Sequence, residues 1–307
     1  MVVEKIINNN IVSSLDEQGN EIVVMGRGLG FKSRPGQIID REKVEKVFHM
    51  ENKKESERLQ EVLADIPIEH IQVCNEIIAY AKKNISNKLS QTIYITVTDH
   101  INYAITRYRN GINFTNALKW EIKKFYHQEF EVGKKAVELI KEKIGIDLSE
   151  DEAASIALHF VNAELGMEIP NTIDVTKLIQ NVLKITTYHF QKVIDEDTLN
   201  YERFITHLKF FSQRVITNKN NHGDDDELHD MIKNQYPDAY ACAEKIKAYI
   251  EQEYNTVLPK EEMAYLTIHI RRIVAISVPK SNEETVSKSN EEIVPKNNDE
   301  TVSKSNE

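Results

Sequence analysis

The sequence predicts an α+β multidomain protein, with a small N-terminal β-sheet domain, two homologous all-α helical-bundle domains and a disordered tail. Three observations support this prediction. β-branched residues cluster at the N-terminal end, an internal repeat occupies the middle of the chain, and an octapeptide repeat ends it. The expected divisions are residues 1–58, 59–170, 171–278 and 279–307.

The residues before Met50 favour short β-strands. Their apolar positions are β-branched and fall in four clusters, at residues 6–7, 11–12, 22–24 and 44–47. Between the second and third clusters, the run 16–20 contains a glycine and an asparagine, which tolerate positive φ and predict a hairpin. The polar run 51–58 then indicates a linker or the exposed start of a helix.

From Pro67 onward the apolar period shifts toward 3.6 residues, which predicts amphipathic helices. Residues 68–81 and 136–144 each contain one apolar stripe. By propensity alone, residues 92–97 would form a strand, because Thr, Ile, Tyr and Val favour sheets. They continue without a turn residue into residues 99–105, so we predict a helix there instead.

The internal repeat is the strongest sign of domain organisation. The run from Leu148 to His159 reappears from Leu258 to His269 at a constant offset of 110. An earlier motif around His100 reappears around residue 207 at an offset of 107. Two tandem helical domains therefore follow, and each contains two matching histidines. The final octapeptides have one apolar anchor per period and bury too little surface to offset their ordering entropy.

Composition and charge restrict the class of protein. The 307 residues are 40% hydrophobic and carry 39 basic against 49 acidic side chains, for a net charge of −10. This balance argues against a protein that coats nucleic acid by bulk charge, but it leaves room for a small recognition surface. Apolar stretches are too short to span a membrane, and residues 1–10 lack the apolar core of a signal peptide. We therefore expect a cytoplasmic protein without membrane insertion.

The two cysteines, Cys74 and Cys242, lie far apart in the sequence, which excludes a disulfide framework and a CxxC metal site. We expect both in the core. The paired histidines do not predict a zinc site, because no third or fourth ligand recurs at a fixed spacing. No GxSxG sequence supplies the nucleophile of a hydrolase. The sequence thus predicts no metal, no cofactor and no enzymatic activity.

A neutral imidazole can instead accept a phosphoryl group, which gives a phosphohistidine with a charge of roughly −1.5 to −2. Such a histidine acts as a switch rather than a catalyst. Duplication alone could also preserve structural histidines, so both interpretations remain open at this point. The remaining histidines are interpreted as ordinary surface or core residues: His49, His70, His127, His189, His222 and His229.

The first domain contains a candidate RNA surface. Residues 26–31 read Gly-Arg-Gly-Leu-Gly-Phe, and residues 22–39 contain three basic residues and no acidic one. Amides such as those of residues 8–10 can read base edges, glycine permits close backbone approach, and Phe31 can stack on an unpaired base. The glycine run does not open a helix, so it is a weak phosphate-binding fingerprint. The alternative is an ordinary turn with Phe31 in a core.

These motifs resemble the BglG/SacY family of transcriptional antiterminators. Residues 6–12 and 19–31 are similar to that family's co-antiterminator RNA-binding domain, and the motifs around the four repeated histidines are similar to its paired PTS-regulation domains. The resemblance covers residues 1 to about 276, departs from the family only in the repetitive tail, and is of the LicT type that regulates β-glucoside operons.

The resemblance implies that the first domain is a four-stranded antiparallel sheet that forms a homodimer and binds a hairpin in a leader mRNA. The hairpin overlaps a transcription terminator, so protein binding prevents the terminator from folding. Polymerase then reads through into a sugar-utilisation operon, here one for a β-glucoside. The implied RNA-binding residues are Lys5, Asn8, Asn10, Gly26, Arg27 and Phe31.

The resemblance also implies control by histidine phosphorylation. A sugar-specific PTS transporter, through its EIIB part, would phosphorylate His100 and His159 when its sugar is absent and so inhibit the protein. The phosphocarrier HPr would phosphorylate His207 and His269 and so activate it. An added phosphate needs a cationic partner, and the sequence offers these candidates: Arg107, Arg109, Arg203, Arg271 and Arg272.

Two alternatives remain open. The helical repeats could be a phosphorylation-responsive interaction or scaffold module without RNA binding, in which the N-terminal sheet only dimerises. A DNA-binding activator with related regulatory domains is the other, although no helix-turn-helix candidate precedes Ile68.

Overall fold

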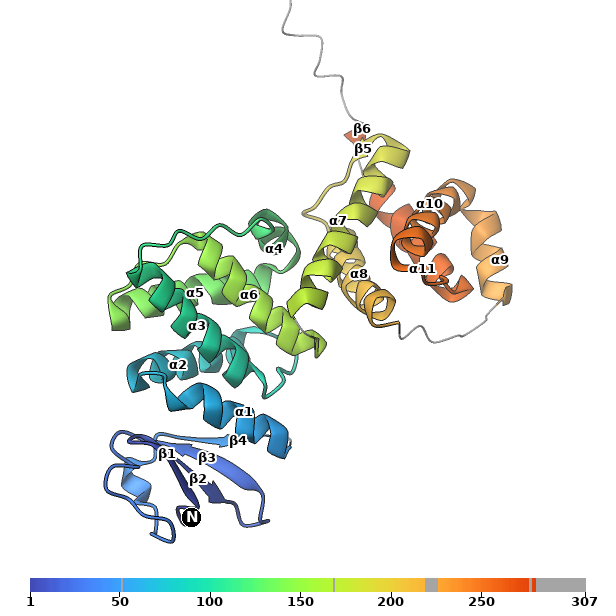
Figure 1. Cartoon of the computed structure of the whole chain (residues 1–307). Helices are drawn as coiled ribbons and strands as arrows, with labels where there is room; N and C mark the ends of the chain where they lie inside the picture. Colours follow the sequence, from blue (N-terminus) through green and yellow to red (C-terminus); the bar gives the residue numbers. More distant parts are fainter. Residues whose placement is uncertain (51, 168, 219–225, 276–277, 280–307) are drawn as a thin grey trace, which may run out of the picture.

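The computed structural model describes residues 1–50, 52–167, 169–218, 226–275 and 278–279 (Figure 1). Within these ranges an antiparallel sheet is followed by helices in two groups, so the predicted fold class is confirmed there. The predicted tail falls almost entirely on residues 280–307, which lie outside this description. The first residue of that predicted tail, Pro279, belongs instead to the short strand β6 (Val278–Pro279). This strand pairs with β5 (Lys192–Val193) in an antiparallel ladder.

The N-terminal sheet has four antiparallel strands in sequence order. The strands are β1 (Lys5–Asn8), β2 (Ile11–Leu15), β3 (Glu21–Met25) and β4 (Lys46–His49). The predicted hairpin closes between β2 and β3, where the Asp16 amide donates to the Asn20 carbonyl at 2.9 Å. Gly19 lies in this turn at a φ of 83°, which glycine adopts without steric cost. A short 3₁₀ helix, η1 (Arg41–Lys43), precedes β4.

The first helical half comprises α1 to α6. These helices are α1 (Lys53–Ala64), α2 (Ile68–Asn84), α3 (Ile93–Arg109), α4 (Lys119–Phe125), α5 (His127–Ile144) and α6 (Glu150–Leu165). The helix expected across residues 92–105 is confirmed as α3. Asn52 caps α1 by accepting from the Glu55 amide, and α5 and α6 end at Gly145 and Gly166 in the left-handed conformation.

The second helical half comprises α7 to α11. These helices are α7 (Ile169–Phe190), α8 (Leu199–Thr217), α9 (Asp226–Gln235), α10 (Pro237–Tyr254) and α11 (Lys260–Val274). By the offsets of the sequence repeat, α3 corresponds to α8, α5 to α10 and α6 to α11. In both halves the first and last members of this set pack together, α3 on α6 and α8 on α11. The duplicated sequence therefore builds a duplicated packing arrangement.

The two faces of the sheet pack against different parts of the chain, because successive side chains of a strand point to opposite faces. One face lies against the first helical half, with α1 nearest to it in Figure 1, and contributes the buried residues Ile11, Val23, Met25 and Phe48. The other face packs against the segment between β3 and β4 in a smaller cluster that includes Val12, Val24, Leu29 and Ile39.

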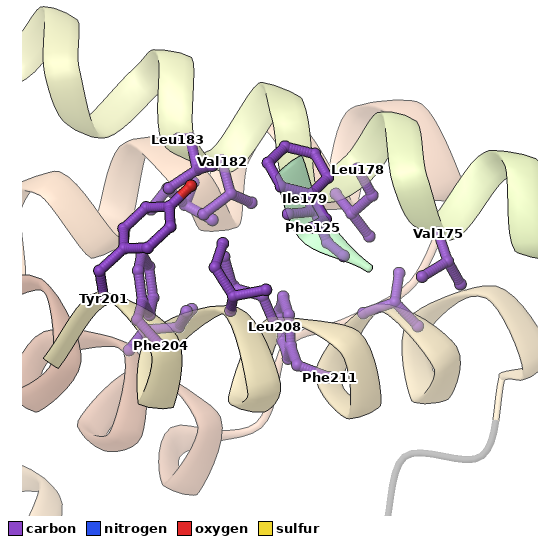
Figure 2. Close-up of a cluster of buried hydrophobic side chains, with 14 of the residues drawn as sticks. Phe125, Val175, Leu178, Ile179, Val182, Leu183, Tyr201, Phe204, Leu208 and Phe211 are labelled. Atoms are coloured by element: carbon purple, nitrogen blue, oxygen red, sulfur yellow. The ribbon is translucent and has the colours of Figure 1, made fainter. Parts of the chain in front are cut away.

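The two helical halves share one buried core. Figure 2 shows Leu178, Ile179 and Val182 of α7 pointing toward the apolar side chains of α8. Phe125, from α4 of the first half, lies among them. Burial of these side chains stabilises the junction between the halves by roughly 1.5–3 kcal/mol for each one fully buried.

Both cysteines are buried, as predicted. The described helices include none with the length and apolar character needed to cross a membrane.

Candidate functional sites

The structure brings the four repeated histidines together in two pairs. His100 on α3 lies beside His159 on α6, with ring centroids 4.6 Å apart. His207 on α8 lies beside His269 on α11, with centroids 4.8 Å apart and ring planes inclined by 24°. Each pair forms because its two helices pack against each other, so the match seen in the sequence corresponds to a contact in each half.

An ion pair adjoins the first histidine pair. Glu152, in the first turn of α6, has Oε2 at 3.3 Å from His100 Nε2. Its other carboxylate oxygen accepts from the Arg107 guanidinium. The side chains of all three residues are largely buried, with exposed fractions of 16% for His100, 12% for Arg107 and 5% for Glu152.

The second pair has the same arrangement. Glu262, in the first turn of α11, has Oε2 at 3.7 Å from His207 Nε2. Its Oε1 accepts from Arg214 Nε at 2.8 Å and from Nη2 at 2.5 Å. Arg214 is 32% exposed, more than its counterpart Arg107.

Burial keeps one histidine of each pair neutral. Burial, and then the neighbouring His100, hold the pKa of His159 well below its usual range. Burial, the neighbouring His207 and Arg272 together lower the pKa of His269 to about 4. Both rings are therefore uncharged near neutral pH and retain a nitrogen lone pair, which an attacking nucleophile requires.

The two glutamates are ionised. Burial by itself would raise the pKa of Glu152, but its contacts with His100 and Arg107 outweigh burial and lower it. The pKa of Glu262 is lowered in the same way, against its burial, by His207 and Arg214. Each site thus contains a carboxylate, a guanidinium and two imidazoles in a largely buried space.

The two glutamates and Arg214 were not among the residues predicted from the sequence, although the repeat contains them. At the same offsets that relate the histidines, Arg107 corresponds to Arg214 and Glu152 to Glu262. Each arginine follows its histidine by seven residues, two helical turns, and so lies on the same helix face. Comparing every polar residue of the two copies, rather than the histidines alone, would have found them.

The other candidate arginines differ in position. Arg203 is exposed, and the Arg271 guanidinium lies 6.0 Å from the centroid of the Tyr236 ring. Arg272 does act on His269, whose pKa it helps to lower.

Two further histidines fit the structural interpretation given to them. His70 is buried, and its Nδ1 lies 2.9 Å from Asn102 Oδ1. His229 is buried, with Nε2 at 3.0 Å from the Tyr240 hydroxyl. Within the described residues, no cluster of three or more His, Cys, Asp or Glu side chains could hold a metal ion.

In the sheet domain, Asn10, Gly26 and Phe31 surround one turn. Asn10 Oδ1 accepts from the Gly28 amide at 2.8 Å, and the Asn10 carbonyl accepts from the Gly26 amide at 2.9 Å. A Cβ at Gly26 would lie 1.7 Å from the Lys43 carbonyl oxygen, so the backbone packing there requires glycine. Phe31 is 59% exposed, which makes the alternative of a core Phe31 wrong.

Two other predicted RNA-binding residues contact the first helical half. Asn8 Nδ2 donates to the carbonyls of Leu63 and Ala64, at the end of α1, at 3.0 Å each. Arg27 Nη2 lies 3.0 Å from Glu69 Oε1, in the first turn of α2. Lys5, on the edge strand β1, is exposed.

Two family models match the parts of the chain that contain these residues. Residues 1–57 match the family model described as CAT RNA binding domain, and residues 75–163 and 180–273 match the PRD domain. Transcription antiterminator LicT of Bacillus subtilis (strain 168) is 49% identical over 274 residues, which cover 89% of this chain and 99% of LicT. The chain belongs to the BglG/SacY family of transcriptional antiterminators.

Another relative of this antiterminator is the beta-glucoside operon antiterminator of Dickeya chrysanthemi, which is 43% identical over 89% of this chain and 96% of its own length. Two solved structures are similar to parts of the antiterminator. The crystal structure of GlcT CAT-PRDI is 29% identical and covers 53% of this chain and 97% of its own, with a TM-score of 0.47. The structure of the LicT antiterminator in complex with its RNA target is 50% identical and covers 18% of this chain and 98% of its own, with a TM-score of 0.17.

Proposed function

We propose that this antiterminator, as a homodimer, stabilises an antiterminator hairpin in the leader mRNA of a β-glucoside utilisation operon, under the control of PTS-dependent histidine phosphorylation. The observation on which this proposal rests is the duplicated, largely buried histidine pair in a chain whose first 57 residues match an RNA-binding domain. RNA binding supplies the output, and the histidine pairs supply the input.

The proposed RNA interface is built on the sheet domain. Phe31 offers an exposed aromatic face on which an unpaired base can stack, and the Lys32 ammonium lies 5.3 Å from the centroid of its ring. Asn10 and Gly26 fix the turn beside it. Arg27 supplies a planar, bidentate donor, and Lys5 supplies an exposed cation for the phosphate backbone.

The proposed regulatory input is phosphoryl transfer to the histidine pairs. HPr is the proposed donor to His207 and His269, and the EIIB part of a sugar-specific transporter is the proposed donor to His100 and His159. The lowered pKa values of His159 and His269 support these two residues as phosphoryl acceptors, because only the neutral imidazole can attack phosphorus. The histidines are modified rather than regenerated in a catalytic cycle, so we do not assign the chain an enzymatic activity.

The experiment measures binding of the full chain to a β-glucoside operon leader RNA, with and without prior incubation with phosphoenolpyruvate, enzyme I and HPr. We expect specific binding that strengthens after HPr-dependent phosphorylation. A leader with its hairpin sequence scrambled but its composition kept is the control. Equal affinity for both RNAs would favour the alternative, a phosphorylation-responsive interaction module without RNA binding.

A further inference from the structure

Each histidine pair has a carboxylate beside it, in the region where phosphorylation would add a second anion. In both halves a glutamate contacts one imidazole of the pair and the guanidinium of the arginine two helical turns further along, and its side chain is 5% exposed in the first half and 14% exposed in the second. Arginine binds carboxylate and phosphate with the same fork of N–H donors. While the glutamate remains in place, its carboxylate therefore occupies both the guanidinium and the imidazole that it contacts.

We propose that Glu152 and Glu262 are placeholders for the phosphoryl group, and that phosphorylation moves Arg107 and Arg214 from the glutamate to the phosphohistidine. This inference rests on the proposed function, because it names how the phosphorylated sites are stabilised. The arginines become phosphate ligands, and the glutamates become competitors that the phosphate must displace.

The placeholder role follows from burial. A buried guanidinium without a counterion is strongly destabilising, so the unphosphorylated site needs an anion to stay folded. Glu152 supplies that anion at the first site, and its place in the first turn of α6 also favours negative charge. Adding a dianionic phosphate within a few ångströms of this carboxylate creates repulsion, which is relieved when the glutamate turns away and the arginine pairs with the phosphate.

The phosphoryl transfer needs only the carrier protein and the antiterminator as reactants. The unprotonated ring nitrogen of His207 or His269 attacks phosphorus of a phosphohistidine on the carrier protein. One N–P bond forms on the antiterminator as one N–P bond breaks on the carrier, and each imidazole keeps the proton on its other nitrogen. The acceptor site gains the whole charge of the phosphoryl group, which is the charge that Arg214 then pairs with.

The two sites differ in how readily the exchange can occur. At the second site Glu262 lies 3.7 Å from His207, against 3.3 Å for Glu152 and His100, and Arg214 is 32% exposed against 12% for Arg107. Water can therefore solvate the displaced glutamate and the moving guanidinium more easily in the second half. We infer that the second site exchanges partners at lower cost than the first.

The test compares wild type with Glu262→Gln, which keeps the side-chain size but removes the competing charge. The full chain is equilibrated with a fixed ratio of phosphorylated to free HPr, and phosphate on each histidine is measured by mass spectrometry of peptides. We expect the equilibrium constant for transfer to the second site to rise about five-fold or more, the lower end of typical coupling between two sites. Glu261→Gln, the neighbouring residue in the same helical turn, is the matched control and should leave it unchanged.

A double variant separates charge exchange from simple loosening of the site. In Glu262→Gln combined with Arg214→Gln, both charges of the ion pair are removed and the proposed phosphate ligand is gone. We expect the gain to disappear in this variant, and the unfolding temperature of each variant checks that the fold persists. A gain that survives loss of Arg214, or an unchanged or lower equilibrium constant in Glu262→Gln, overturns the exchange. Absence of any phosphate on the wild-type chain would instead overturn the proposed function, and the exchange with it.

Discussion

The guanidinium of Arg27 lies 3.0 Å from the carboxylate of Glu69, so a proposed RNA-binding residue of the sheet domain is paired with the first turn of α2 in the same chain. Asn8 is engaged in the same way by the last carbonyls of α1. Contacts between the sheet domain and the first helical half therefore involve two residues that are also proposed to bind RNA.

The Arg27 pair predicts that Glu69→Gln strengthens RNA binding. Both side chains are more than half exposed, and such pairs contribute roughly 0–1 kcal/mol, so the affinity for leader RNA should rise by no more than about five-fold. The free energy of unfolding should fall by no more than about 1 kcal/mol for the same reason. Titration of the full chain with leader RNA measures the effect. Glu76→Gln, which removes an exposed partner of Lys143 from the same helix, is the control, and an equal gain there would point to general charge instead.

Phe31→Ala should weaken RNA binding without weakening the fold. Phe31 is exposed, so its loss removes little buried surface, whereas loss of a stacked base costs about 1–3 kcal/mol of binding free energy. Residues 1–58 contain ten basic and ten acidic side chains, so stacking and base-edge contacts should outweigh phosphate neutralisation and the salt dependence should be modest. Trp120→Ala, at an exposed aromatic of α4, is the control. Unchanged affinity in a folded Phe31→Ala chain would remove this residue from the interface.

Gly26→Ala and Gly28→Ala should destabilise the sheet domain for different reasons. The Cβ at Gly26 would overlap the Lys43 carbonyl, so the connection to β4 must move, and we expect a loss of about 3 kcal/mol or more. The Cβ at Gly28 meets open space, and its φ of 70° costs only about 1–2 kcal/mol. Chemical denaturation of both variants measures the difference, and the reverse order of stabilities would contradict the close approach at Gly26.

A carboxyl cluster at the junction of the helical halves predicts a pH dependence. Burial, and then the neighbouring Glu129, raise the pKa of Glu164 to about 7, while Lys209 of α8 lies 3.6 Å from Glu129. A carboxyl whose pKa is higher in the folded state binds more protons there than when unfolded, so stability falls as the pH rises. The fall should lie between the ordinary value near 4.5 and about 7.

Glu164→Gln should therefore raise the unfolding temperature at pH 8 and change it little at pH 4.5. The amide can keep the hydrogen bond that Asn87 donates to this side chain at 2.6 Å. Thermal unfolding at a series of pH values measures the effect. Glu138→Gln, at an exposed partner of Lys135, is the control. An unfolding temperature that rises equally at both pH values would show that the charge of Glu164 is not the cause.

Much of the secondary structure could be predicted because local patterns decide it. The four β-branched clusters became β1 to β4, and Gly19 closes the hairpin where the turn residues predict it. Residues 93–97 show the limit of local propensity, because they form the start of α3 although their side chains favour sheets. Their apolar positions are buried against α2 and α1, and packing outweighs a propensity difference of a few tenths of a kcal/mol per residue.

The repeat in the sequence determined that there would be two histidine sites, because residues at one offset occupy one place in two copies of the same packing arrangement. Only the tertiary structure decided which charges complete them. Helix packing pairs Arg107 with Glu152, 45 residues apart in the chain, and places that glutamate beside the His100 imidazole. It pairs Arg214 with Glu262 beside His207 in the same way. The contacts of Asn8 and Arg27 with α1 and α2 were equally beyond the sequence, because patterns within a segment determine which face is apolar but not which neighbour covers it.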